Sequence, residues 1–166
     1  HPLINVIPDG KLNRALSSDA QQLISVAASI SASHGGLCVT PENVLHAAML
    51  SPMFQAYGLF QIFGAKLERL YNEITDGYPF DFDIRKVEPK KDLDEIYGNT
   101  QFRKIWNFAC LWATRLKHEA IDSRHFLLGM MSLTADEEDG CIAANGLEAC
   151  KLNLDEAVGF MEAFGV

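Results

Sequence analysis

The run IDSRHFLLGM at residues 121–130 has a counterpart 82 positions earlier, VTPENVLHAA at residues 39–48. Each run begins with a β-branched residue, followed by a side chain suited to cap a helix, Asp122 in one and Thr40 in the other. Apolar residues then recur at helical spacing in both runs. Two equivalent short helices, separated by half of the chain, predict an internal duplication.

The duplication extends over most of the sequence, because the same shift aligns the surrounding patterns. Each half has helical segments in the order long, short, short and medium. A period of about 82 residues is too long for a tetratricopeptide or ankyrin unit. We therefore predict two repeats that bury their apolar faces against each other about a pseudo-twofold axis. The shift pairs Ala27 with Ala109, Leu45 with Leu127, Met49 with Met131, Gly58 with Gly140, Gly64 with Gly146 and Leu70 with Leu152.

Helix start signals occur throughout, and no alternating strand pattern does, so the predicted fold class is all-α. We expect one domain over residues 1–166, with repeat one at about 12–77, a connector at about 78–95 and repeat two at about 96–164. The expected helix starts are Ser18 with Gln21, Thr40-Pro41, Ser51-Pro52, Asn99 or Thr100, Asp122, Thr134 with Glu137, and Asn153 with Glu156.

The connector contains two prolines and a dense mixture of charges, which predicts a surface segment. Within it Tyr78, Phe80 and Phe82 alternate with other residues, mostly acids. These aromatic side chains either cover the seam between the repeats or form a docking surface for a partner, since aromatic residues often anchor interfaces.

The formal net charge of −8 makes nucleic acid a poor candidate partner, because its phosphates are also negative. No apolar run approaches the length of about 18 residues that a membrane helix needs. The four cysteines form no C-x-x-C pair, which favours reduced thiols and a cytoplasmic location. Since the sequence has no starting Met, we expect a piece of a longer chain.

Residues for catalysis or for metal binding do not form a recognisable set. The five histidines include no pair at the i, i+4 spacing of a helical metal site. Cys110 lies among Phe108, Ala109 and Leu111, which indicates a buried thiol. Trp106 and Trp112 occupy apolar positions of one long helix and are expected in the core. We expect no catalytic residue, no metal and no cofactor.

The two short runs resemble the signature of the Clp N-terminal domain, roughly apolar-G-T-E-H-apolar-L-L-G/A-L. The steps Phe63-Gly64 and Asn145-Gly146 fall where that family ends its third helix. The resemblance extends from Leu12 to about Phe164. It implies a mobile module of a Clp-type AAA+ unfoldase, or a free-standing relative, that receives substrates or adaptor proteins. The sequence has no G-x-x-x-x-G-K-[ST] phosphate loop, so any ATPase would lie elsewhere.

In some members of that family the signature Glu of each repeat helps to hold phosphoarginine. The matching positions here are Glu42 and Arg124, which carry opposite charges. At most one half is therefore expected to bind that mark. The family's His is kept as His125, which we expect to bond within its repeat, whereas Asn43 replaces it in the first copy. These four residues and the connector aromatics are the candidate protein-binding residues.

The resulting hypothesis is a non-catalytic module that binds substrate proteins or adaptors for unfolding or proteolysis. A first alternative is a stand-alone accessory subunit that docks onto a Clp protease core. These two differ in whether a phosphate loop follows in the full gene product. A small helical thiol enzyme or hydrolase is an alternative of another class, for which the sequence supplies no catalytic set.

Overall fold

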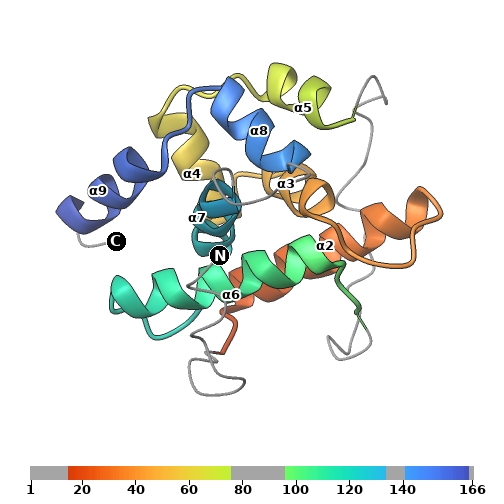
Figure 1. The fold of residues 1–166 in the computed structure, drawn as a ribbon, viewed down its shortest axis with the longest axis horizontal. Coiled ribbons are helices and arrows are strands. Elements are labelled where there is room, and N and C mark those ends of the chain that lie inside the picture. The colour runs from red at the N-terminus through yellow and green to blue at the C-terminus, as the bar shows by residue number, and fades with distance from the viewer. Residues whose placement is uncertain (1–14, 76–95, 134–140, 165–166) are drawn as a thin grey trace.

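The computed structural model describes residues 15–75, 96–133 and 141–164, and these form an all-α fold without strands (Figure 1). The predicted class is confirmed. The connector aromatics Tyr78, Phe80 and Phe82 and the expected helix start at Thr134 lie outside the described residues. The helices are α2 (Ser18–Ser33), α3 (Pro41–Met49), α4 (Gln55–Ile62), α5 (Leu67–Thr75), α6 (Thr100–Arg115), α7 (Ser123–Leu133), α8 (Ile142–Ala149) and α9 (Leu154–Phe164).

The two long helices, α2 and α6, are related by the predicted shift of 82 positions and have 16 residues each. Their starts are capped in the same way. The Ser17 hydroxyl accepts a hydrogen bond from Ala20 N–H at 3.1 Å, and the Asn99 side chain accepts one from Phe102 N–H at 2.8 Å. The cap of α2 is therefore Ser17 and not the predicted Ser18, whereas the cap of α6 is Asn99, one of the two predicted residues.

Two isolated parallel bridges join the halves and show the pseudo-twofold relation directly. Leu16 pairs with Ile121, and Gly98 pairs with Val39. The shift of 82 positions converts the first pair into the second. In the first bridge Ser17 N–H donates to the Ile121 carbonyl at 2.9 Å, and in the second Asn99 N–H donates to the Val39 carbonyl at 3.0 Å. Each half thus pairs the segment before its long helix with the segment before the other half's short helix.

Beyond α7 the shift grows from 82 to 87 positions, so part of the predicted alignment is wrong. Helix α4 begins at Gln55 and α8 at Ile142, while α5 begins at Leu67 and α9 at Leu154. Gly64 therefore corresponds to Lys151. Three predicted pairs are therefore wrong by five residues: Gly58 with Gly140, Gly64 with Gly146, and Leu70 with Leu152.

The start of α4 was also placed too early in the sequence. The predicted signal was Ser51-Pro52, but the helix begins at Gln55 after Phe54, whose side chain makes no capping hydrogen bond. By contrast the predicted cap of α9 is confirmed, because the Asn153 side chain accepts a hydrogen bond from Glu156 N–H at 3.1 Å.

Four residues with positive φ confirm the corrected register. Gly35 (φ 76°) follows the long helix of the first half, and Lys117 (φ 60°) follows that of the second. Gly64 (φ 66°) and Lys151 (φ 63°) form the other pair, after α4 and α8. Glycine adopts this left-handed conformation without the steric cost that a β-carbon adds. The turn geometry is thus kept in both halves, although the second half uses lysine.

The short helices α3 and α7 lie at the centre of the molecule, with α2 packed on α3 and α6 on α7 (Figure 1). Gly129 allows the close approach of α6, because a β-carbon there would lie 2.6 Å from the Ile105 carbonyl oxygen. Trp106 and Trp112 are half-buried and pack against the core. The largest fully buried side chains are Phe54, Phe60, Phe108, Phe126, Leu23, Ile24, Ile30, Leu45, Leu70, Ile105, Ile121 and Leu127.

Candidate protein-recognition site

The start of α3 is held by a capping box, which gives Asn43 a structural role. Asn43 N–H donates to the Thr40 hydroxyl oxygen at 3.2 Å, and Thr40 N–H donates back to Asn43 Oδ1 at 2.9 Å. Pro41 occupies the first position of the helix, where a missing N–H costs nothing. Glu42 is half-buried in the first turn, where a carboxylate interacts favourably with the helix dipole. A binding role for Asn43 or Glu42 stays a prediction.

The equivalent start of α7 uses His125 in the place of Asn43. Asp122 N–H donates to His125 Nδ1 at 2.8 Å, which reproduces the Thr40–Asn43 contact. The Asp122 carboxylate caps the helix by accepting from Arg124 N–H at 2.9 Å. His125 is fully buried, so it bonds within its repeat as predicted.

The Arg124 side chain folds back onto Asp122. Its Nη2 lies 2.7 Å from Oδ2, and its Nε lies 3.1 Å from Oδ1. Burial alone would raise the pKa of Asp122, but the hydrogen bonds and the charge of Arg124, together with His125, outweigh it and lower that pKa. Asp122 is therefore a carboxylate at neutral pH, and it neutralises the guanidinium beside it. The charge reversal between Glu42 and Arg124 is thus partly cancelled by the neighbouring Asp122.

His118 adds a contact that the sequence spacing did not predict. Its Nδ1 lies 2.7 Å from His125 Nε2. Because His125 Nδ1 accepts from a backbone N–H, the proton of the neutral ring is on Nε2 and is donated to His118. The two imidazole rings and the cap of α7 thus form one chain of hydrogen bonds.

The ligand atoms of His118, Asp122 and His125 lie within 4.8 Å of one another, as in many metal sites. Most of their lone pairs are already committed to other groups, however. Both Asp122 oxygens accept from Arg124, and both ring nitrogens of His125 are engaged. A metal ion would have to break the helix cap and expel the guanidinium. This arrangement serves to hold α7 in place rather than to bind a cation.

Asp19 is a structurally important residue that sequence analysis missed. Its carboxylate accepts hydrogen bonds from Ser123 N–H at 2.8 Å and from Gln55 N–H at 3.1 Å. Ser123 Oγ in turn accepts from Ala56 N–H at 2.8 Å. The starts of α4 and α7 are thus capped from a distant helix, which explains why Phe54 needs no capping side chain.

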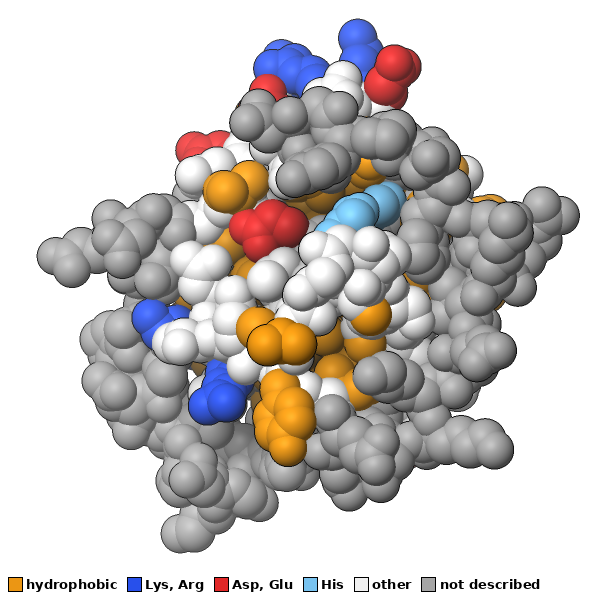
Figure 2. Space-filling view, turned by 90° about the vertical axis from the view of Figure 1, so that its right-hand side faces the viewer, with side chains coloured by type: hydrophobic (Ala, Val, Ile, Leu, Met, Phe, Trp, Pro, Cys, Tyr) orange, Lys and Arg blue, Asp and Glu red, His pale blue; other side chains and the backbone are white. Residues whose placement is uncertain are grey.

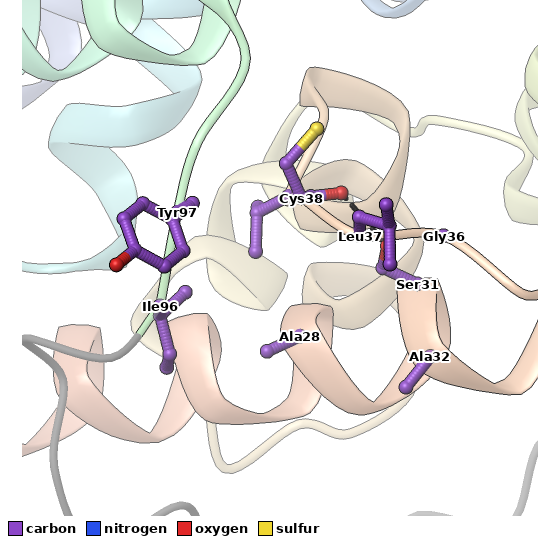
Figure 3. A pocket seen from close by; sticks show the side chains of 9 residues that line it. Ala28, Ser31, Ala32, Gly36, Leu37, Cys38, Ile96 and Tyr97 are labelled. Carbon is purple, nitrogen blue, oxygen red and sulfur yellow. Dashed lines mark hydrogen bonds between the residues drawn. The ribbon is translucent and has the colours of Figure 1, made fainter.

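A shallow cleft of about 60 Å³ lies where the bridge between Val39 and Gly98 joins the two halves. Figure 3 shows Ile96 and Tyr97 on one side, the turn that contains Leu37 on the other, and α2 beneath. The small side chains of Ala28 and Ala32 line it on the α2 side. We call it the Leu37–Tyr97 cleft, and its lining residues are Ala28, Ser31, Ala32, Gly36, Leu37, Cys38, Val39, Ile96 and Tyr97.

Two exposed side chains, Leu37 and Tyr97, flank this cleft. Leu37 has 95% of its surface exposed and Tyr97 has 67%. The turn that presents Leu37 is fixed, since Ser31 Oγ donates to the Cys38 carbonyl at 2.7 Å and Gly36 N–H donates to the Ser31 carbonyl at 2.8 Å. Figure 2 shows a group of apolar side chains on one face of the molecule, with acidic and histidine side chains above them. Leu37 and Tyr97 together place two exposed apolar side chains at one site, which is suited to contact another molecule.

Comparison with solved structures shows that the fold is shared. One similar chain comes from preliminary structural investigations of a malarial protein secretion system. The match covers 90% of this chain and 93% of that chain, with a TM-score of 0.66 and 16% sequence identity. At this identity the likeness concerns the fold alone.

Sequence comparisons identify the family. A search of curated protein sequences finds no match. The family model described as the Clp repeat (R) N-terminal domain matches residues 15–139, which is more than half of the chain. This range includes both signature runs and the bridges that relate the two halves. The chain belongs to the Clp repeat (R) N-terminal domain family.

Proposed function

We propose that this domain is a non-catalytic protein-recognition module, and that Leu37 and Tyr97, on either side of the cleft, contact an apolar side chain of a substrate or adaptor protein. The observation that carries the proposal is the exposed Leu37 on a fixed turn, opposite the exposed Tyr97, at the junction of the repeats. Clp N-terminal domains generally bind substrates or adaptors, which supports the same function.

No described helix of the chain is long and apolar enough to cross a membrane.

The geometry favours an extended segment with one anchoring side chain. A volume of about 60 Å³ is small, so the cleft suits part of a single side chain rather than a helix face. Burial of apolar surface contributes about 25 cal/mol per Å², and Leu37 and Tyr97 both have most of their surface still available for it. Contacts of this size give weak and reversible binding, as expected of a module that passes substrates on.

The test is the binding of a fluorescently labelled unfolded protein, such as reduced casein, measured by anisotropy. Replacing both Leu37 and Tyr97 by Ser should weaken binding about thirtyfold or more, since anchors at the centre of an interface are worth more than about 1 kcal/mol each. Ile142→Ser is the matched control, because Ile142 is a similarly exposed apolar residue (56%) on another element. Equal loss in the control, or none in the double variant, would refute the cleft as the binding site.

The signature carboxylate needs a separate test. If Glu42 helps to hold a phosphoarginine guanidinium, Glu42→Arg should abolish binding of a phosphoarginine peptide and leave casein binding unchanged. Glu68→Arg is the control, because Glu68 is also an acid in the first turn of a short helix. Since Arg124 is paired with Asp122, we expect no second phosphoarginine site in repeat two.

The two alternative functions, an accessory subunit of a protease core and a thiol enzyme, have less support. The same recognition would serve a stand-alone subunit on a Clp protease core, and co-elution of the domain with that core would identify it. A thiol enzyme is disfavoured by the chemistry of the thiols. Cys110 is buried, and burial raises the pKa of Cys150, with the Arg69 charge opposing this only in part. A thiol with a raised pKa is a poor nucleophile at neutral pH.

A further inference from the structure

A second cavity, of about 180 Å³, lies where the turn after α4 meets the turn after α8. These helices come together with α5 in the upper part of Figure 1. Three of the lining residues are cationic and none is acidic. We call this the basic pocket, and its lining residues are Gly64, Lys66, Arg69, Ala149, Cys150 and Lys151.

The basic pocket is unusual for a chain of net charge −8. Lys66, Arg69 and Lys151 are all exposed, and the described residues provide none of them with a salt bridge within 4.0 Å. The acids nearest in sequence on these elements, such as Glu68 and Glu148, are not part of the lining. Single cations on a surface are ordinary, but three around one cavity concentrate a positive potential there.

Helix ends and one neighbouring acid reduce this charge without cancelling it. The C-terminal ends of α4 and α8 contribute about half a negative charge each, and the start of α5 contributes about half a positive one. Glu73 also acts on Cys150 in the pocket, where its charge opposes that of Arg69. Three cations against these contributions leave a positive pocket, so an anion is the ligand that fits.

The position of Lys151 is notable because of its backbone. It has φ 63°, whereas Gly64 has φ 66° at the equivalent turn, and both residues line the same pocket. At positive φ a β-carbon lies too close to the backbone, which costs energy that glycine avoids. This conformation places a cation at the pocket in the second half, where the first half has no side chain.

We propose that the basic pocket binds a carboxylate-rich segment of a partner protein. Carboxylates on successive residues can each meet one of the cations, which come from three separate positions on α5 and the two turns. A compact phosphate would need converging backbone N–H groups, such as a helix N-terminus supplies. Here two of the three helix ends at the pocket are C-termini, which present carbonyl oxygens. The pocket is separate from the Leu37–Tyr97 cleft, and the inference does not depend on that cleft.

The test uses a fluorescein-labelled hexaglutamate peptide and the 166-residue chain, with anisotropy at low ionic strength. We expect Arg69→Gln and Lys151→Gln each to weaken binding two- to fivefold, as for single exposed ion pairs. Lys117→Gln is the matched control, because Lys117 also follows a helix with φ 60° and is exposed, but does not line the pocket. All three variants change the net charge equally. Circular dichroism melting curves would show that they remain folded.

Specific binding predicts a loss with both pocket variants and wild-type affinity with Lys117→Gln. An equal loss in all three variants would mean that only the overall charge matters, and would overturn the proposal. So would failure of the wild-type protein to bind the peptide. If inorganic phosphate binds in place of the peptide, measured by calorimetry, the pocket is an anion site of another class and the proposal is also wrong.

Discussion

The Asp19 carboxylate in α2 accepts a hydrogen bond of 2.8 Å from the backbone N–H of Ser123, which lies 104 residues further along the chain. The other oxygen of the same carboxylate accepts from Gln55 N–H at 3.1 Å. One side chain of the first repeat therefore satisfies the free N–H groups at the starts of α7 and α4. The positions that correspond to Asp19 and Ser123 in the other halves are Gln101 and Pro41, so this contact is not repeated by the pseudo-twofold axis.

Replacing Asp19 by Ala should destabilise the domain by about 2 kcal/mol, because two helix starts lose a capping acceptor worth about 1 kcal/mol each. Urea denaturation followed by circular dichroism measures this loss. Asp155→Ala is the matched control, since Asp155 is an exposed acid in the first turn of α9. This substitution should lower the free energy of unfolding by at most a few tenths of a kcal/mol. Equal losses in the two variants would show that Asp19 acts through the helix dipole alone.

Glycine substitutions should separate close helix packing from helix propensity. A β-carbon on Gly129 would lie 2.6 Å from the Ile105 carbonyl oxygen, whereas one on Gly58 would have no atom within 4 Å. Gly129→Ala should therefore lower the free energy of unfolding by about 1–3 kcal/mol, as overpacking does. Gly58→Ala should raise it by about 0.5–1 kcal/mol, because alanine favours helix. A stabilised Gly129→Ala variant would mean that α6 and α7 are far enough apart to admit a β-carbon at residue 129.

The pairing of Asp122 with Arg124 should make stability depend on pH. The pKa of Asp122 is lowered in the folded state, against about 3.9 for an unperturbed aspartate. Its contribution is therefore fully present above that value and is lost as the pH falls through the lower folded pKa. The difference in unfolding free energy between wild type and Asp122→Asn should be smaller below about pH 4 than at pH 5. Urea titrations at each pH measure it.

Arg124→Gln provides the control for this prediction. It keeps the carboxylate at the helix start but removes the guanidinium that lowers the pKa of Asp122. The pH dependence relative to Asp122→Asn should become weaker in this background. If it is unchanged, the pairing with Arg124 is not the source of the effect.

Local signals in the sequence predicted the fold class, the helix order and several helix starts. Asn99, Asp122 and Asn153 were predicted as caps because each side chain bonds two or three residues away. The role of Asp19 could not be predicted in this way, since its partners Gln55 and Ser123 are brought close only by the packing of the two repeats. The contact between His118 and His125 lies within the second repeat, but it spans the turn between α6 and α7 and so follows no helical spacing.

The error in the register of the second half has a specific cause. The sequence pattern predicts a helix end at Gly146, but this residue lies inside α8, where a β-carbon would be 3.2 Å from Ile74 Cγ2 and 3.3 Å from Leu70 Cδ1. This glycine serves close packing against α5. Helix α8 ends at Ala149, and Lys151, which follows it in the left-handed conformation, is not a glycine. A sequence pattern that relies on glycine to mark helix ends fails at both points.

The cap of α7 offers a test in which one repeat supplies the replacement for the other. Asn43 in the first repeat accepts from Thr40 N–H, as His125 accepts from Asp122 N–H in the second. His125→Asn should therefore retain the capping hydrogen bond that His125→Ala loses, and should be more stable by about 1 kcal/mol. Both variants lose the buried ring and its contact with His118, so both should be less stable than wild type.

His118→Ala separates the two roles of His125 in the same measurement. It removes the contact between the imidazole rings, and His125 Nδ1 can still accept from Asp122 N–H. Because His118 is only half-buried, we expect a smaller loss of unfolding free energy than with His125→Ala. If His118→Ala costs as much as His125→Ala, and Asn at 125 gives no recovery, then the ring pair and not the helix cap holds α7 in place. That result would also remove the reason for regarding His125 and Asn43 as equivalent residues.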